Sequence, residues 1–241
     1  MHLSVIIPAY NEAKTIEKIL KLYNEYLARQ PYDYELILVN DGSADETLEI
    51  ASNLKKEIKN LRIIDQQPNQ GKGMAVRTGL LAARGEYRLF LDADNATPIE
   101  HLDAVWPCFT AGADIVIGSR HVKDAAGTEV IVSQVLWKRF LGKAGNLLFQ
   151  SLAIWGIWDT QCGFKIMRAE LAKKLLPLSK CRRWALDAEL LVLARQANYN
   201  IAAIPVKWSN SKESRVGFKG YFITLIELIG IKWRVFTKKY L

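Results

Sequence analysis

Two aspartates that follow an apolar segment are the clearest chemical feature of the sequence. Residues 87–91 (Tyr-Arg-Leu-Phe-Leu) are rich in strand formers, and Asp92 and Asp94 come directly after them. At the end of a strand, side chains two residues apart point the same way, so both carboxylates are expected to face one point. Paired carboxylates favour a cation between them, and Mg²⁺ or Mn²⁺ suits oxygen ligands shared with substrate phosphates. The pair predicts a divalent-metal site, although a lone Asp-x-Asp is more often an ordinary turn.

Two further turns carry groups that suit a nucleotide. Asp41, in Asn-Asp-Gly-Ser, offers a hydrogen-bond acceptor to a base or ribose, or else forms a simple Asp-Gly turn. The segment Gly71-Lys72-Gly73 offers backbone N–H groups and a cation to a phosphate at a helix start, or else is a loop with a solvated lysine. It is not a Walker A loop, because the Gly-x-x-x-x-Gly-Lys-Ser/Thr pattern is missing from the sequence.

The elements that must position these groups alternate along the chain. Apolar runs typical of strands are separated by segments with helical spacing of apolar residues. This order predicts an α/β fold, a mostly parallel sheet with helices on both faces, whose ligands bind at the carboxyl ends of the strands. The predicted strands are residues 3–8, 34–39, 61–64, 87–91 and 114–118. The turns at 8–11, 40–43, 71–73 and 92–94 all fall at or near that edge.

The charge of the chain is divided unevenly. Residues 1–130 hold 14 Lys and Arg against 19 Asp and Glu, a net −5, whereas residues 131–241 hold 19 against 6, a net +13. The basic half favours an anionic membrane or a phosphorylated substrate. Nucleic acid is disfavoured, because no zinc finger, RNA-binding aromatic signature or continuous basic helix is found. Three scattered cysteines indicate a reducing compartment, and no signal peptide is expected at the start of the sequence.

Several motifs together resemble a known family. Residues 4–12 (Ser-Val-Ile-Ile-Pro-Ala-Tyr-Asn-Glu) and the motifs at 40–43, 71–73 and 92–94 are similar to the family-2 glycosyltransferases of GT-A fold. Those are inverting enzymes that use nucleotide-sugars and a divalent ion. The motifs at 92–97, 118–120, 159–165 and 183–191 narrow the resemblance to the dolichyl-phosphate β-glucosyltransferases, close kin of the dolichyl-phosphate mannose synthases. The resemblance covers roughly residues 3–215.

The resemblance implies roles for individual residues. Asp92 and Asp94 would hold Mg²⁺ or Mn²⁺, and Arg120 would face the acceptor phosphate. The nucleotide-sugar would be held by Pro8, Ala9, Tyr10, Glu12, Asp41, Lys72 and Asp92. The chain departs from the family at position 40, where Asn replaces the usual Asp. It also shows no membrane helix ahead of the first strand, which leaves the mode of membrane attachment open. A peripheral location at the cytoplasmic membrane face is expected.

A phosphate acceptor would need cations rather than a base. A lipid monophosphate has a second pKa of about 6 and is largely dianionic near neutral pH, so it attacks the sugar without a general base. Arg120, Arg139 and Arg215 are the candidates to seat it, because a guanidinium grips phosphate with two hydrogen bonds. Asp187 and Glu189 lie in an apolar segment and either belong to the site or pair with Arg182 or Arg183.

Other functions remain open at this point. A family-2 enzyme that acts on a sugar hydroxyl would use Asp187 as a base, and a donor such as GDP-mannose would also fit the motifs. A nucleotide-sugar-binding module without turnover belongs to a different class, and donor hydrolysis would separate it from an enzyme. We expect the chain to transfer glucose from UDP-glucose to a polyprenyl (dolichyl-type) phosphate, with Asp94, Asp187 and Arg120 as catalytic residues.

The C-terminal segment has its own pattern. Apolar residues at helical spacing predict an amphipathic helix over 216–241 that follows a glycosyltransferase domain over 1–215. Within that domain, 1–130 is expected to be the nucleotide-sugar half and 131–215 the acceptor half. Glu227 and Lys232 interrupt the helix before the length of about 20 apolar residues that a membrane span requires. It would lie on an anionic membrane surface or dock on the core of the domain.

Overall fold

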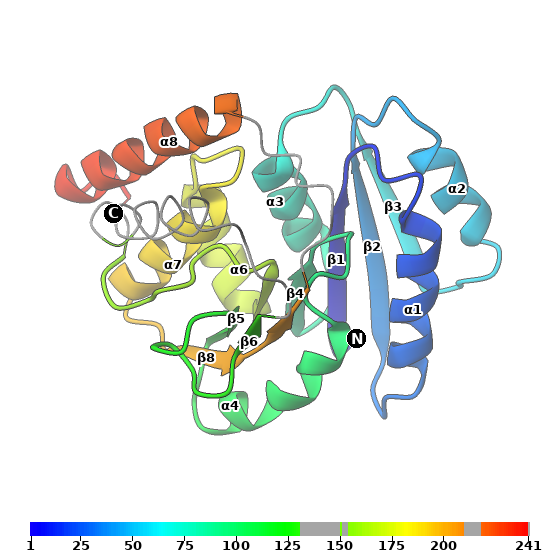
Figure 1. Ribbon diagram of the computed structural model, residues 1–241, viewed down its shortest axis with the longest axis horizontal. Coiled ribbons are helices and arrows are strands. Elements are labelled where there is room, and N and C mark those ends of the chain that lie inside the picture. The colour runs from blue at the N-terminus through cyan, green and yellow to red at the C-terminus, as the bar shows by residue number, and fades with distance from the viewer. Residues whose placement is uncertain (131–149, 151–153, 210–217, 241) are drawn as a thin grey trace.

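A seven-stranded sheet forms the centre of the molecule in the computed structural model, which describes residues 1–130, 150, 154–209 and 218–240 (Figure 1). The strands stand in the order β3-β2-β1-β4-β7-β5-β8. Their bounds are β1 (Leu3–Ala9), β2 (Tyr34–Asp41), β3 (Leu61–Gln66), β4 (Tyr87–Leu91), β5 (Ile115–Ser119), β7 (Phe164–Arg168) and β8 (Ile201–Pro205). Two short strands, β6 (Glu129–Val130) and β9 (Lys207–Trp208), pair in a second sheet.

All neighbouring pairs in the large sheet are parallel except those of β7. This strand runs antiparallel to both β4 and β5, with Leu91 opposite Phe164 and Ile117 opposite Lys165. The mostly parallel α/β sheet predicted from the alternation of strands and helices is thereby confirmed. The antiparallel insertion was not predicted, and it places residues 162–165 beside the carboxyl end of β4.

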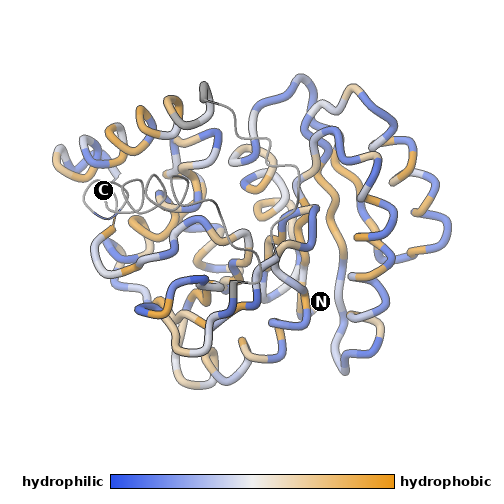
Figure 2. Tube along the Cα trace, in the orientation of Figure 1, coloured by the Kyte–Doolittle hydropathy of each residue, from blue (hydrophilic) through white to orange (hydrophobic). Residues whose placement is uncertain are grey.

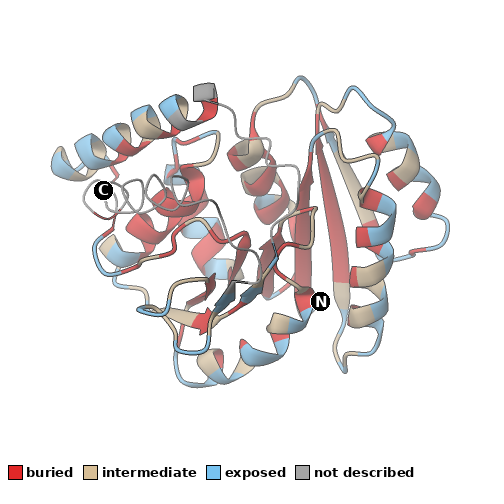
Figure 3. Ribbon diagram, in the orientation of Figure 1, coloured by how far each residue is buried: buried red, intermediate tan, exposed pale blue. Residues whose placement is uncertain are grey.

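Helices cover both faces of the sheet. Side chains of β1 alternate between two buried clusters, so Leu3, Val5 and Ile7 pack on one face and Ile6 on the other. All seven residues of β1 are buried, as expected for a strand covered on both sides (Figure 3). Figure 2 shows much of the central sheet in orange, the colour of hydrophobic residues.

The two faces use different helices. The first is covered by α1 (Ile16–Ala28), α2 (Thr47–Leu54), η1 (Ile99–Ala104) and α4 (Trp106–Thr110). The second is covered by α3 (Lys72–Ala82), α6 (Ala169–Leu175), η2 (Leu176–Leu178) and α7 (Leu186–Gln196).

The last helix, α8 (Phe218–Phe236), packs outside this second layer, against α7 (Figure 1). Leu228 and Ile231 are buried there, and Arg234 forms an ion pair with the buried Glu189 at 3.3 Å. The predicted amphipathic helix is therefore present, and one of its faces docks on the core. None of the helices in the described ranges is long and apolar enough to cross a membrane.

Candidate active site

The carboxylate of Asp92, just past the end of β4, is the meeting point of three segments. The Lys72 ammonium lies 2.6 Å from its Oδ1. Gly163 is so close on the other side that an added Cβ would lie 2.1 Å from Asp92 Oδ2, which only glycine avoids. Behind it, the hydroxyl of the buried Tyr23 donates to the Asp92 carbonyl at 3.2 Å. The Gly-Lys-Gly turn, the Asp-Ala-Asp motif and the 159–165 motif thus converge on one side chain.

Asp94 lies in the tight turn that follows. Its Oδ1 accepts a hydrogen bond from the Ala96 N–H at 2.9 Å, and Asn95 between them has a positive φ of 53°. The Asn95 side-chain oxygen is buried and has no hydrogen-bond partner among the described residues. An orphaned acceptor is costly in an interior, and an ordered water, a ligand or an ion can supply the missing partner.

The loop that carries Lys72 is held by Asp41. The Asp41 carboxylate is buried and accepts hydrogen bonds from the N–H groups of Gln70 and Gly71, both at 2.8 Å, and from the Gln66 side chain at 2.7 Å. In the structure, Asp41 therefore holds the loop that carries Lys72. Its contact with a nucleoside, expected from the sequence, stays a prediction.

Position 40, where the chain departs from the motif of the family that it resembles, has a local explanation. The Asn40 side chain is fully buried and donates to Asp65 Oδ1 at 2.7 Å. An aspartate there would face another carboxylate in a buried position. Asn40 thus complements Asp65, at the adjacent ends of β2 and β3.

A second lysine lies beneath the site. Lys165 of β7 is fully buried, and its ammonium lies 2.6 Å from Asp187 Oδ1 and 2.6 Å from the Cys162 carbonyl oxygen. Burial lowers the pKa of Lys72, but the carboxylates of Asp92 and Asp187 outweigh burial and hold that pKa above its usual value. Asp187, at the start of α7, thus belongs to the same electrostatic cluster as Lys72 and Asp92.

Arg120 follows β5 and is clamped by an acid. Its Nε and one terminal nitrogen donate to the two carboxylate oxygens of Asp159 at 2.7 and 2.8 Å, and its backbone N–H adds a third bond at 2.8 Å. Burial lowers the pKa of Arg120, and Asp159 more than reverses this, so that the pKa is raised. The guanidinium is thus kept charged and fixed in orientation. Its predicted contact with the acceptor phosphate stays a prediction.

The remaining predicted residues fall into three groups. Pro8 and Ala9 are buried at the end of β1, next to Val39 and Asn40 of β2, whereas Tyr10 is exposed. Glu12 accepts a hydrogen bond from the Thr15 hydroxyl at 2.8 Å, at the start of α1. Arg139 and Arg215 lie outside the described residues.

The structure corrects the partners suggested for two buried acids. Asp187 pairs with Lys165 rather than with Arg182 or Arg183. Glu189 pairs with Arg234 and accepts backbone hydrogen bonds from residues 180 and 181, so it anchors α8 rather than joining the site.

Sequence reasoning assigned no role to Asp159 and Lys165. The sequence does contain a signal for Lys165, which lies between the apolar residues Phe164 and Ile166. A lysine within an apolar run is rarely buried unless it is paired with an acid, so a partner could have been expected.

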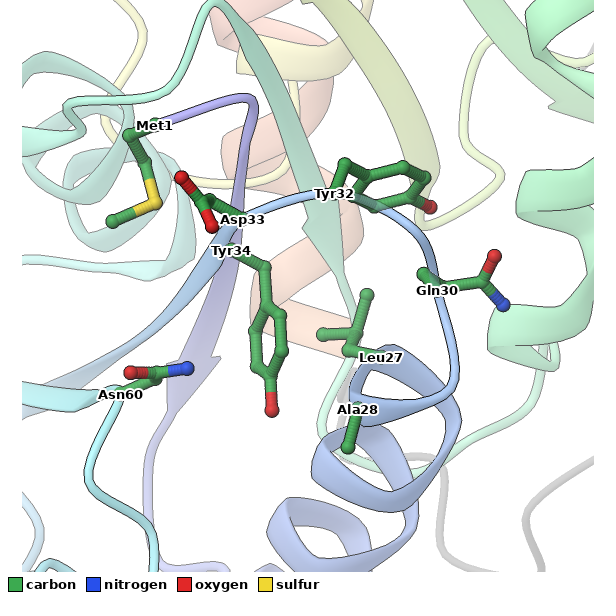
Figure 4. A pocket seen from close by; sticks show the side chains of 8 residues that line it. All are labelled: Met1, Leu27, Ala28, Gln30, Tyr32, Asp33, Tyr34 and Asn60. Carbon is green, nitrogen blue, oxygen red and sulfur yellow. The ribbon is translucent and has the colours of Figure 1, made fainter.

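A shallow hollow of about 240 Å³ lies at the opposite edge of the sheet (Figure 4). It is lined by the C-terminal end of α1 and by residues at or just before the starts of β1, β2 and β3, among them Met1, Asp33 and Asn60. The strands begin there, so it is separate from the Asp92 cluster, which lies where they end.

Comparison with known proteins agrees with this arrangement. The family model described as "Glycosyl transferase family 2" matches residues 4–176. A dolichyl-phosphate β-glucosyltransferase of Trichomonas vaginalis is 35% identical over 96% of this chain and 71% of its own length. The human dolichyl-phosphate β-glucosyltransferase is 33% identical over 98% of this chain and 76% of its own length.

Solved structures share the fold. Mannosyl-3-phosphoglycerate synthase from Rubrobacter xylanophilus superposes with a TM-score of 0.71 at 16% identity, over 99% of this chain and 75% of that one. Glucosyl-3-phosphoglycerate synthase from Mycobacterium tuberculosis, in complex with Mn²⁺, UDP-glucose and phosphoglyceric acid, gives 0.70 at 20% identity, over 96% and 80%. With a family model that matches most of its length and with these relatives, the chain belongs to glycosyl transferase family 2.

Proposed function

We propose that this chain transfers glucose from UDP-glucose to a polyprenyl phosphate of the dolichyl type. The observation that carries the proposal is the convergence on Asp92 of three separate motifs, through Lys72 at 2.6 Å and through the close approach of Gly163. Relatives named dolichyl-phosphate β-glucosyltransferase, 33–35% identical, support the choice of sugar and acceptor.

The donor side of the site has the charges that a leaving diphosphate needs. Lys72 has its pKa raised by the surrounding carboxylates, despite the opposing effect of burial, and so stays cationic at neutral pH. Its ammonium contacts Asp92 Oδ1 at 2.6 Å, and in a donor complex it would contact the diphosphate. An ammonium at that place stabilises the charge that develops as the sugar leaves.

The carboxylates of Asp92 and Asp94, two residues apart just past β4, are the proposed ligands of a divalent ion. Within the part of the chain that is described, no three His, Cys, Asp or Glu side chains form a group that could hold a metal alone. An ion would therefore be held by Asp92 and Asp94 together with donor phosphate oxygens. When bound, Mg²⁺ or Mn²⁺ would neutralise charge on the diphosphate.

On the acceptor side, the protein would bind the acceptor phosphate and orient it toward the sugar. Asp159 holds the Arg120 guanidinium by two hydrogen bonds and leaves its remaining N–H groups to a phosphate oxygen. A dianionic phosphate is itself a competent nucleophile, so no proton has to be removed.

The outer face of α8 supplies a surface for the membrane in which such an acceptor resides. Its exposed apolar side chains, 52–80% accessible, repeat every three or four residues: Phe222, Ile226, Ile229, Trp233 and Phe236. The exposed Lys232, Lys238 and Lys239 lie on or next to this helix, as in a helix that rests on anionic lipid. Figures 2 and 3 show α8 as a largely apolar helix with many exposed residues. We place the enzyme at the cytoplasmic membrane face.

The function is tested with a labelled-sugar transfer assay to a short polyprenyl phosphate, with UDP-glucose and GDP-mannose as donors. UDP-glucose should give product, EDTA should abolish it, and Mn²⁺ or Mg²⁺ should restore it. Asp94→Asn should abolish transfer while the fold is kept, with exposed Asp33→Asn as the control. Full activity in chelator, or a preference for GDP-mannose, contradicts the proposal.

The membrane contact has its own test, co-sedimentation with phosphatidylcholine vesicles with and without phosphatidylserine. Trp233→Asp and Ile229→Asp should reduce binding, most clearly on the anionic vesicles. Leu81→Asp, on the exposed side of α3, is the matched control and should bind as the wild type does. Equal binding by all four proteins contradicts an α8 contact.

A further inference from the structure

Glu227 is the one acidic residue in the sequence of α8, and its carboxylate is hydrogen-bonded to the turn that precedes α7. Its Oε1 accepts hydrogen bonds from the N–H groups of Arg182 and Arg183 at 2.8 and 3.1 Å, and its Oε2 accepts one from Ala185 at 3.2 Å. These three N–H groups immediately precede α7. Glu227 therefore caps the turn at 182–185 from another helix, where a negative charge is favoured by the unpaired N–H groups and the helix dipole.

The turn at 182–185 also packs directly against the first residues of α3. The Arg182 carbonyl accepts a hydrogen bond from the Met74 N–H at 2.9 Å. A Cβ added to Gly73 would lie 2.5 Å from the Arg183 carbonyl oxygen, and one added to Gly71 would lie 2.8 Å from that of Arg182. The two glycines flanking Lys72 thus let the backbone of this turn lie directly on theirs.

These contacts form a continuous path. Glu227 holds the 182–185 turn, the turn holds the first residues of α3, and Lys72 at that position reaches Asp92 at 2.6 Å. We propose that Glu227 is a positioning residue that fixes the Lys72 ammonium for the donor diphosphate. This inference rests on the proposed function, in which Lys72 contacts that diphosphate.

A purely structural cap would behave differently from a positioning residue. Loss of such a cap would lower stability and weaken every ligand of the site to a similar degree. A residue that acts through Lys72 affects only the ligand that Lys72 touches, and its effect disappears once Lys72 is removed. A double-mutant cycle separates the two cases.

The experiment is isothermal titration calorimetry of UDP and of UMP, each with Mn²⁺, on folded wild type, Glu227→Gln, Lys72→Met and the double variant. We expect Glu227→Gln to weaken UDP about five- to tenfold and to leave UMP unchanged, because UMP lacks the second phosphate. In the Lys72→Met background, Glu227→Gln should weaken UDP no further. Glu170→Gln, an exposed glutamate in the first turn of α6, is the matched control.

Additive losses, or equal losses for UDP and UMP, would overturn the inference while leaving the proposed function intact. No effect of Lys72→Met on UDP would overturn both, and this result is recognised from the single variant alone. If circular dichroism shows that Glu227→Gln does not fold, Glu227→Asp carries the same test. It keeps the charge but shortens the reach, so a smaller loss confined to UDP is expected, and an unchanged UDP affinity would again overturn the inference.

Discussion

The ammonium of Lys72 and the carboxylate of Asp92 lie 2.6 Å apart, which joins the Gly-Lys-Gly turn to the Asp-Ala-Asp motif in one ion pair. In the proposed function, Lys72 supplies positive charge to the donor diphosphate, and Asp92 holds the ammonium in place for it. Each residue was a candidate from sequence, but only the fold shows that they contact each other.

Replacement of Lys72 by methionine should impair donor use. A charge-assisted hydrogen bond to phosphate contributes roughly 1.5–3 kcal/mol, so kcat/KM for UDP-glucose should fall on the order of ten- to a hundredfold. Lys72→Arg should recover part of the loss. Steady-state kinetics would check this, with exposed Lys18→Met as the control; wild-type kcat/KM in Lys72→Met would show that the lysine has no contact with the donor.

Gly163→Ala should damage transfer by displacing a carboxylate. The new Cβ would lie 2.1 Å from Asp92 Oδ2, so Asp92 or β7 must move. A shift of this kind costs roughly 1–3 kcal/mol, and we expect at least a tenfold fall in kcat with a folded protein. At Gly230, the nearest atom to an added Cβ is a nitrogen of the Arg234 guanidinium at 3.2 Å, a much smaller overlap on a group outside the proposed site, so Gly230→Ala should keep its activity. Equal activity of the two variants would exclude this close approach as a constraint.

Asn40→Asp should lower stability at neutral pH. It would replace the donor to Asp65 Oδ1 by a second carboxylate in a fully buried position, at a cost of roughly 1–3 kcal/mol. Adding Asp65→Asn restores one donor and one acceptor and should recover most of the loss. Urea unfolding of the two variants measures this, and an Asn40→Asp protein as stable as the wild type would refute the pairing.

Much of the sheet is predictable because its parallel strands are local features. Five of the six parallel strands are apolar runs that end in a turn, as in residues 34–39 before Asn40, and need no distant partner to be recognised; the sixth, β8, was not predicted. β7 escaped prediction because Lys165 and Arg168 interrupt its apolar pattern, and because alternation of strands and helices gives no sign of an antiparallel insertion.

The residues of the site also divide into those that short motifs reveal and those whose role depends on the tertiary fold. Asp92, Asp94 and Lys72 are recognisable from short motifs, because their chemistry depends on near neighbours in sequence. The roles of Asp159 and Asp187 depend on Arg120 and Lys165, which only the tertiary fold brings to them. For α8 the sequence left the core and the lipid surface open as alternatives. In the structure one face docks on the core and the opposite face stays exposed.

Acid should weaken the Arg120–Asp159 pair in a defined pH range. Burial raises the pKa of Asp159, but Arg120 outweighs it and holds that pKa below its usual value of about 3.9. The stabilisation is therefore complete above about pH 4 and is lost as the pH falls through the lowered folded pKa. Asp159→Asn should cost about 3–5 kcal/mol at pH 7, and the difference from wild type should shrink toward pH 2.

Denaturant unfolding at several pH values, with exposed Asp33→Asn as a control, checks this expectation. A difference between wild type and Asp159→Asn that stays constant down to pH 2 would mean that the pair does not depend on the charge of Asp159.

The acceptor is the central claim, and one measurement tests it most directly: transfer of labelled glucose from UDP-glucose, with Mn²⁺, to a short polyprenyl phosphate and to the matching polyprenyl alcohol. The phosphate should be glucosylated and the alcohol should not, because the site supplies cations to a ready nucleophile and removes no proton. Arg120→Lys should lower transfer to the phosphate. Equal transfer to the alcohol, abolished by Asp187→Asn, would contradict the account and indicate a hydroxyl acceptor with Asp187 as its base.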